Sequence, residues 1–193
     1  MAGHARFTAV LDACVLYPVG VADALISLAV AGLYAAKWTA AIEDEWIRNL
    51  ELTRPELQGR LSRRRDDMRT AVPDWEVPVG AWQTLAPCLS LPDPGDVHVL
   101  AAAIAGHADC IVTTNLRHFP DDLLRPYGIE AIHPDDFMVA QLDLDEFTAL
   151  AAFRDMRTRK KNPALNAEEF AEALERNGLV ATASRLRAAA PVI

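Results

Sequence analysis

Four oxygen-bearing side chains stand where a site for phosphate-ester chemistry can be assembled. Asp12 ends a run of apolar and β-branched residues, and Asn115 follows a second such run. Glu45 lies within a segment of helical pattern, and Asp96 begins another. Converging carboxylates repel one another, and a hard divalent cation such as Mg²⁺ or Mn²⁺ relieves that repulsion through oxygen ligands. Such a cation polarises phosphoryl oxygens and activates water, so the four residues are candidates for metal-assisted hydrolysis.

Each of these residues also has a purely structural interpretation. An aspartate after a strand is often a turn residue, and Asp96, which follows Pro94-Gly95, suits a helix N-cap. Glu45 has Glu43 and Asp44 beside it and fits the exposed face of a helix. Spacing alone therefore leaves both capping and catalysis open.

The elements that must position these side chains follow an alternating pattern. Buried strands are predicted over residues 6–12, 108–114 and 128–132. The clearest helical patterns between them cover residues 40–52 and 97–107. Strands separated by helices predict an α/β fold, a parallel sheet with helices on both faces. Ligands bind beyond the carboxyl ends of such strands, which is where Asp12 and Asn115 are expected.

The connecting segments carry weaker signals. Asp23 is expected to cap a helix that runs to about residue 35, and residues 37–39 are a short extended candidate. Residues 56–70 are predicted to form one basic amphipathic helix. Five prolines make residues 71–94 irregular, with a short strand near residues 77–79.

The character of the chain changes near residue 143. Helices are predicted over residues 144–160, from Asn166 to Gly178, and onward to about residue 190. Asn166 and Glu169 have the spacing of a capping box. We therefore predict an α/β domain over residues 1–140 and a helical C-terminal extension over residues 141–193.

Composition limits the class of protein. The chain has 193 residues, 51% hydrophobic and 24% charged, which is enough for one substantial core. The longest apolar run, residues 24–36, is too short to cross a bilayer, and no signal peptide is recognised. The three cysteines lack metal-ligand spacing, so we expect a reducing cytoplasmic location.

The charge is acidic overall but locally clustered. A net charge of -8, from 27 acidic and 19 basic residues, excludes a uniformly basic nucleic-acid binder. Two basic clusters remain: Arg54, Arg60, Arg63, Arg64, Arg65 and Arg69, and Arg154, Arg157, Arg159, Lys160 and Lys161. Each cluster is either the solvated face of a helix or a surface that contacts phosphates.

Four segments occur together in one order. They are residues 7–16 (FTAVLDACVL), 38–50 (WTAAIEDEWIRNL), 93–103 (DPGDVHVLAAA) and 108–119 (ADCIVTTNLRHF). These segments resemble the PIN-domain ribonucleases, specifically the VapC-type toxins of bacterial toxin–antitoxin pairs. The resemblance covers residues 6–140, and the tail resembles the helical extension of a longer subgroup of these toxins.

The resemblance implies roles for the acidic residues. Asp12 and Asp96 match direct metal ligands, with Asp93 an adjacent second choice for Asp96. Glu45 matches the helical glutamate of the family better than Glu43 does, as a ligand or an outer-shell base. The fourth acid of the commonest family pattern is Asn115 here, whose amide oxygen is able to ligate but supplies no charge.

The substrate contacts are less sharply indicated. Thr113 or Thr114 is expected to position a water or a phosphate, and a structural role at the strand end is the alternative. Arg63 and Arg64 are expected to bind the RNA backbone. His118 lies near the site, but a surface position is the preferred interpretation.

The resemblance also implies a biological setting. The expected protein is a cytoplasmic Mg²⁺- or Mn²⁺-dependent endoribonuclease, the toxin of a type II toxin–antitoxin pair. Its expected substrate is structured RNA such as tRNA or rRNA. Its expected partners are a small antitoxin that inserts a peptide over the acidic cleft and a second copy of the chain, with no membrane involved.

Two alternatives stay open. A non-catalytic RNA-binding PIN module is favoured by Asn115 and by the negative net charge. A different phosphoryl-transfer enzyme with an acid cluster is the other; an aspartyl-phosphate phosphatase would need a second aspartate two residues after Asp12, where Cys14 stands. The absence of a P-loop, of Gly-x-Gly-x-x-Gly and of a Gly-x-Ser-x-Gly elbow argues against nucleotide binding and esterase chemistry.

Overall fold

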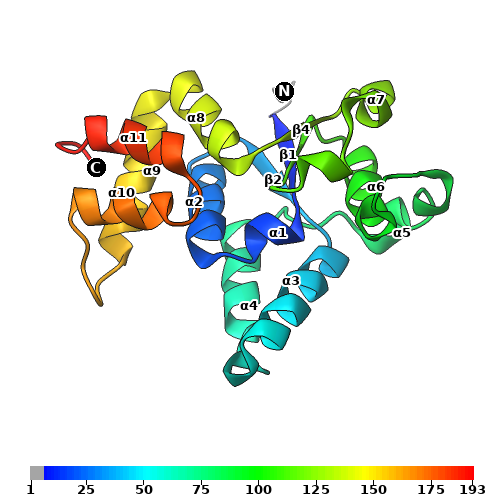
Figure 1. Ribbon diagram of the computed structural model, residues 1–193, viewed down its shortest axis with the longest axis horizontal. Helices are drawn as coiled ribbons and strands as arrows, with labels where there is room; N and C mark the ends of the chain where they lie inside the picture. The colour runs from blue at the N-terminus through cyan, green and yellow to red at the C-terminus, as the bar shows by residue number, and fades with distance from the viewer. Residues whose placement is uncertain (1–6) are drawn as a thin grey trace.

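A parallel sheet forms the centre of the computed structural model, which describes residues 7–193 (Figure 1). Its strands are β1 (Thr8–Leu11), β2 (Ala35–Lys37), β3 (Cys110–Val112) and β4 (Glu130–Ile132). All neighbouring pairs are parallel, in the order β2-β1-β3-β4. The predicted parallel α/β fold is therefore confirmed. Arg6, at the start of the first predicted strand, lies outside the described residues, as do residues 1–5.

Helices connect the strands and cover the sheet. Up to residue 133 they are α1 (Ala13–Leu16), α2 (Val19–Val30), α3 (Ala40–Thr53), α4 (Ser62–Ala71), α5 (Val79–Trp82), α6 (Val97–Ala105) and α7 (Asp121–Leu124). Helix α6 packs against β1 and β3, whereas α2 packs against β2 on the side that faces the C-terminal helices (Figure 1). Helices α3 and α4 project together from the carboxyl end of the strands.

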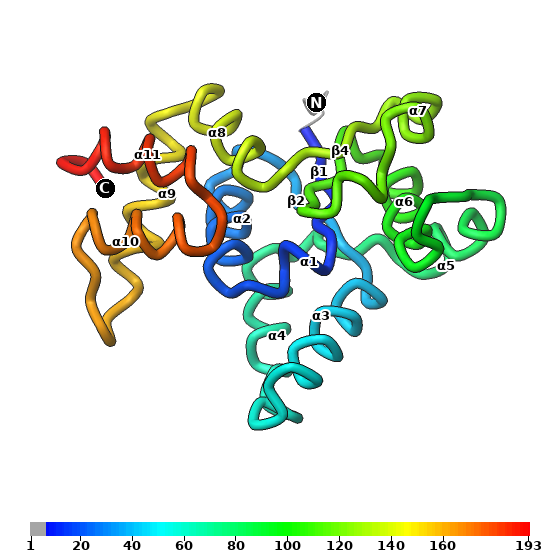
Figure 2. The backbone as a smooth tube through the Cα atoms, viewed as in Figure 1, coloured from blue at the N-terminus to red at the C-terminus, as the bar shows by residue number. Residues whose placement is uncertain are grey.

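The C-terminal extension consists of four helices. They are α8 (Pro134–Leu144), α9 (Glu146–Arg159), α10 (Ala167–Glu175) and α11 (Val180–Ala188). The predicted capping box is confirmed: Asn166 accepts from the Glu169 backbone, and the Glu169 carboxylate accepts from Asn166. Figure 2 shows the chain passing from β4 through α8 to these helices. Helix α8, which was not predicted, runs through residue 140, and the division at that residue stays a prediction.

Two predicted helix starts are wrong. Helix α2 begins at Val19, after Pro18, so Asp23 lies inside the helix and pairs with Arg159 at 2.9 Å. Pro18 is the N-cap, and the buried residues Val21, Ala22, Ala24 and Leu25 lie on both sides of Asp23. Packing of this apolar face outweighs the capping preference of aspartate. The basic helix begins at Ser62 because Gly59, at a φ of 73°, ends the short turn Pro55–Leu57 that precedes it.

The core joins the sheet to the C-terminal helices. Its largest fully buried side chains include Trp38, Trp46, Phe119, Phe137 and Phe153, which come from both parts of the chain. Near residues 77–79, the expected strand is only a single parallel bridge between Trp38 and Glu76. Among residues 7–193, no helix is long and apolar enough to cross a membrane.

Candidate active site

Asp12 and Thr113 meet at the carboxyl edge of the sheet. Leu11 pairs with Val112 in the parallel ladder, so the next residues on β1 and β3 emerge side by side. The Asp12 side chain is almost completely buried, with the residue 2% exposed. The Thr113 hydroxyl donates a hydrogen bond of 2.7 Å to Oδ2 of Asp12.

Cys14 makes a second contact with the same carboxylate oxygen. Its thiol donates to Oδ2 of Asp12 at 3.0 Å and lies 3.3 Å from the Thr113 hydroxyl. Burial, reinforced by the negative charge of Asp12, raises the pKa of the Cys14 thiol to about 12. The thiol is therefore protonated at neutral pH and is not a nucleophile.

Glu45 reaches this edge from α3. Helix α3 starts at Ala40 because Thr39 caps it, with its side chain accepting from the Ile42 backbone at 3.1 Å. Burial raises the pKa of Glu45, and the negative charges of Asp12 and Asp96 raise it further. His98 opposes this rise, with its Nε2 3.5 Å from a Glu45 carboxylate oxygen.

Glu43, two residues earlier, is committed to the fold. It is fully buried and accepts from the Trp38 indole at 2.9 Å and from the Arg69 guanidinium at 3.1 Å. Arg69 also forms an ion pair with it. Glu45 is thus the glutamate of α3 that interacts with the other acids.

Asp96 lies at the junction between the turn Pro94–Asp96 and α6. Burial raises its pKa, and the charges of Asp12 and Asp93 act in the same direction. A hydrogen bond of 2.7 Å between Asp96 Oδ2 and His118 Nδ1 counteracts this rise. The negative charge of Asp12 thus raises the pKa of both Glu45 and Asp96.

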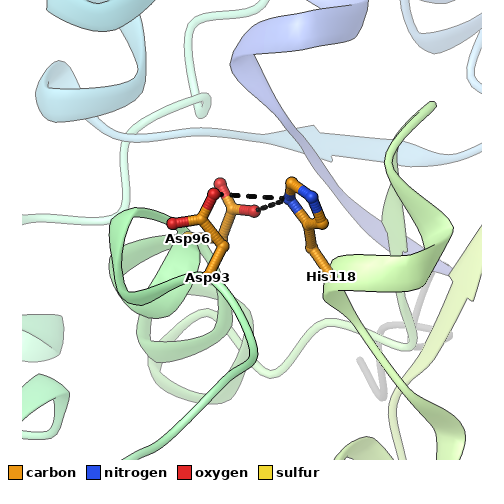
Figure 3. A group of neighbouring side chains, drawn as sticks. All are labelled: Asp93, Asp96 and His118. Atoms are coloured by element: carbon orange, nitrogen blue, oxygen red, sulfur yellow. Dashed lines mark hydrogen bonds and ion pairs between the residues drawn. The ribbon is translucent and has the colours of Figure 1, made fainter.

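His118 lies among the acids rather than on the open surface (Figure 3). Its Nδ1 is 2.7 Å from Asp96 and 3.6 Å from Asp93, and ligand atoms of the three residues lie within 4.8 Å of one another. Sequence reasoning preferred a surface histidine and ranked Asp93 second. No periodic pattern marks His118, because it ends a short turn, Leu116–His118, rather than a helix or strand.

The residues after β3 contact the site in different ways. Asn115 is half-buried, and its backbone N–H donates to the Thr113 hydroxyl at 3.0 Å. Within residues 7–193, no hydrogen bond involves the Asn115 side chain. Thr114 is exposed and donates its backbone N–H to the Cys14 sulfur at 3.3 Å.

Two neighbouring arginines of α4 have different environments. The Arg63 side chain is 90% exposed, with only a 3.8 Å contact to Asp67. The Arg64 guanidinium lies 4.5 Å over the Trp46 ring and donates to the backbone carbonyls of Leu16 and Tyr17. Burial lowers the pKa of Arg64 to about 10. Arg63 presents its charge to solvent, whereas Arg64 is bound within the protein.

The donor set suits a hard divalent cation. The oxygens of Asp12, Glu45 and Asp96 come from three separate elements, and their mutual repulsion is the kind that a bound cation relieves. The imidazole of His118 and the carboxylate of Asp93 add further donors beside Asp96. Carboxylates with one nitrogen are compatible with Mn²⁺ as well as Mg²⁺.

Comparisons with known proteins agree with this architecture. Residues 8–117 match the family model of the PIN domain over more than half of the chain, so the chain belongs to the PIN-domain family. Residues 134–188 match the model of the VapC50 C-terminal domain. The resemblance to VapC-type PIN proteins with a C-terminal extension is therefore confirmed.

A curated relative matches part of the chain. "Putative ribonuclease VapC50" of Mycobacterium tuberculosis (strain ATCC 25618 / H37Rv) is 49% identical over 79 residues. The aligned region covers 41% of this chain and 47% of that protein, so the match spans about half the relative's length. No solved structure matches this chain.

Proposed function

We propose that the protein is a metal-dependent endoribonuclease that hydrolyses phosphodiester bonds of RNA. The observation that carries this proposal is the cluster of Asp93, Asp96 and His118, whose ligand atoms lie within 4.8 Å of one another. The negative charge of Asp12 raises the pKa of both Glu45 and Asp96, so these carboxylates add to the acidic character of the same edge of the sheet. Family membership and the 49% identity to a protein named as a ribonuclease support the same chemistry.

Asp12 and Asp96 would hold the cation, with Glu45 as a ligand or a base and Asn115 as a supporting ligand. A bound Mg²⁺ or Mn²⁺ would supply charge neutralisation at the phosphate and lower the pKa of water. Burial raises the pKa of Glu45, which makes its carboxylate a better proton acceptor for the attacking water. Burial also raises the pKa of Asp96, and the hydrogen bond with His118 opposes that rise.

Exposed arginines on and before α4 would bind the RNA backbone. The Arg63 side chain is 90% exposed, and Arg54 and Arg60 lie exposed before that helix. Phosphate contacts of this kind add affinity without reading sequence, which suits a substrate recognised by its shape. A structured RNA such as tRNA or rRNA is the proposed substrate, with the exposed Thr114 near the reacting phosphate.

The proposed biological role is that of the toxin in a type II toxin–antitoxin pair, acting in the cytoplasm. A small antitoxin would cover the acidic cleft, and the toxin would form a homodimer. A separate groove of about 1100 Å³ between α2, α4 and α9, which none of the site acids lines, offers a surface for a protein partner. Val19, Val30 and Phe147 line it with exposed apolar surface, which marks protein-binding sites.

A cleavage assay tests the enzymatic proposal. The full chain is incubated with structured RNA in Mg²⁺, in Mn²⁺ and in a chelator, and Asp12→Asn is the matched variant. Cleavage that needs the cation and is absent in Asp12→Asn is the expected result. Cleavage by both proteins in chelator would sink the proposal.

A non-catalytic RNA-binding PIN module is the second candidate. Asn115 favours it, because an amide leaves the site with one carboxylate fewer than the common family pattern. RNA binding without cleavage in either metal would establish this candidate.

A further inference from the structure

The two oxygens of Asp12 have different surroundings. Oδ2 accepts from the Thr113 hydroxyl at 2.7 Å and from the Cys14 thiol at 3.0 Å. Within residues 7–193, no hydrogen bond reaches Oδ1. In an ordinary buried structural acid, both carboxylate oxygens accept hydrogen bonds. Asp12 differs, because one oxygen accepts two hydrogen bonds and the other accepts none from these residues.

Backbone amides fix the direction in which these two donors point. The Thr114 N–H donates to the Cys14 sulfur at 3.3 Å, and the Asn115 N–H donates to the Thr113 hydroxyl at 3.0 Å. With an acceptor position of each group filled by an amide, the thiol and hydroxyl hydrogens are left to donate to Asp12. Two short relays thus run from the chain after β3 to the carboxylate after β1.

We propose that Cys14 and Thr113 are positioning residues that hold Oδ2 of Asp12 and leave Oδ1 free to bind the catalytic cation. The inference rests on the proposed function for the identity of the ligand. In this arrangement the backbone amide of Asn115 orients the Thr113 hydroxyl. Thr113 in turn holds Asp12 and does not contact the substrate.

The advantage of this arrangement is preorganisation. A carboxylate that rotates freely pays conformational entropy when it binds a cation, whereas one held by two donors does not. The thiol also fits a confined space: Cys14 is partly buried between the ends of β1 and β3, within 3.3 Å of the Thr113 hydroxyl. Hydrogen-bond partners of metal ligands typically contribute about 10-fold or more to metal affinity.

The test compares two substitutions at each position in the full-length protein. Cys14→Ala and Thr113→Val remove a donor, whereas Cys14→Ser and Thr113→Ser keep one. Cys110→Ala is the matched control, because Cys110 is also a buried thiol and makes no hydrogen bond to Asp12 within residues 7–193. Mn²⁺ affinity is measured by calorimetry, the Tm is measured without metal, and exchange of the Thr114 and Asn115 amides is followed by NMR.

Each donor-removing variant has an expected signature. Cys14→Ala should weaken Mn²⁺ binding about 10-fold and speed exchange of the Thr114 amide selectively. Thr113→Val should weaken Mn²⁺ binding at least as much and speed exchange of the Asn115 amide instead. The two serine variants should keep Mn²⁺ affinity within about twofold of the parent. Cys110→Ala should lower the Tm without changing affinity.

Several results would overturn the inference. Parental Mn²⁺ affinity in both Cys14→Ala and Thr113→Val would contradict the inference. Equal losses of Mn²⁺ affinity in Cys14→Ala and Cys14→Ser would also contradict it, because they would indicate that Cys14 acts through packing and not through its hydrogen bond. Unchanged amide exchange in Cys14→Ala and Thr113→Val would refute the relays even in a protein that binds no Mn²⁺. Absence of Mn²⁺ binding by the parent would instead count against the proposed function.

Discussion

Asp12 at the edge of the sheet and Asp135 at the start of α8 are both buried carboxylates, at 2% and 8% exposure. Asp135 has both oxygens occupied. Its Oδ2 accepts from the Ala181 backbone at 2.8 Å, and its Oδ1 accepts from the Thr182 backbone at 2.8 Å and hydroxyl at 2.7 Å. These bonds tie α8 to the first turn of α11.

Asp12 has donors on one oxygen and acids as its electrostatic neighbours. It acts on Glu45 and Asp96 as a like charge, and in both cases it raises the partner's pKa. Burial therefore has different consequences for Asp12 and for Asp135. Asp135 is stabilised by donors on both oxygens and holds the fold, whereas Asp12 has donors on one oxygen only and stands near other negative charges, at a cost in repulsion.

The largest expected effect separates activity from stability at the sheet edge. Asp12→Asn or Asp96→Asn should reduce RNA cleavage by more than about 10³-fold, because each removes a charge that is proposed to hold the cation. The metal-free Tm should stay level or rise, since like-charge repulsion is relieved. Cleavage rates and thermal unfolding of each variant check this, and parental cleavage by a folded variant would remove that residue from the site.

The reverse outcome is expected at Asp135, the buried carboxylate at the start of α8. Asp135→Ala should lower the free energy of unfolding by about 3 kcal/mol, because it removes the acceptor of the Ala181 N–H and leaves the buried N–H and hydroxyl of Thr182 unpaired. Cleavage per folded molecule should be unchanged. Denaturant unfolding measures the loss, and a variant as stable as the parent would erase the distinction between the two regions.

Glu43 tests the comparison within a single helix. Glu43→Gln leaves Arg69 without its partner and should cost about 2 kcal/mol, less than a fully buried pair because Arg69 is partly exposed. Glu45→Gln, two residues away, should cost little stability and instead reduce cleavage. Both are measured on the same preparations, and equal stability losses would contradict the assignment.

A smaller effect is expected from adding a charge at Asn115. If the Asn115 side chain faces the cleft, Asn115→Asp supplies a further carboxylate and should improve cation binding by roughly 1–2 kcal/mol. Half-maximal cleavage should then need less Mg²⁺, with little change at saturation. Coincident Mg²⁺ titrations of parent and variant would mean that the side chain is only a turn residue.

The smallest expected effect extends the contrast to two neighbouring arginines. Arg63→Gln should lower the slope of RNA affinity against salt by about 1, as expected for one phosphate contact, with unchanged stability. Arg64→Gln should instead destabilise the protein, because its guanidinium binds the carbonyls of Leu16 and Tyr17. Unchanged salt dependence of RNA affinity in Arg63→Gln would mean that Arg63 belongs to the solvated face of α4 and contacts no phosphate.

The strands and their polar ends could be predicted because they follow from local patterns. Apolar runs that stop at Asp12 and Thr114 place both residues at one edge of a parallel sheet, and the sheet has that form. The start of α2 could not be predicted from Asp23, since Pro18 competes with it as a start signal. Local patterns also carry no information about His118, whose partner lies 22 residues earlier.

The different environments of Arg63 and Arg64 were equally beyond prediction. Both stand in a run of three arginines, and neither composition nor periodicity distinguishes them. Arg64 is buried because α4 packs so that one side chain meets the Trp46 ring and the carbonyls after α1. The hydrogen bond from Arg64 to the Tyr17 carbonyl joins residues 47 positions apart.

The placement of β1 beside β3 has a consequence during translation. Asp12 is made near the start of the chain, but Thr113, its hydrogen-bond partner, is 101 residues downstream. At roughly 5–20 residues per second, ribosomes need about 5–20 s to reach it. A nascent chain therefore carries its first acid for many seconds with no assembled site around it. The proposed active site therefore cannot assemble until most of the PIN domain has been synthesised.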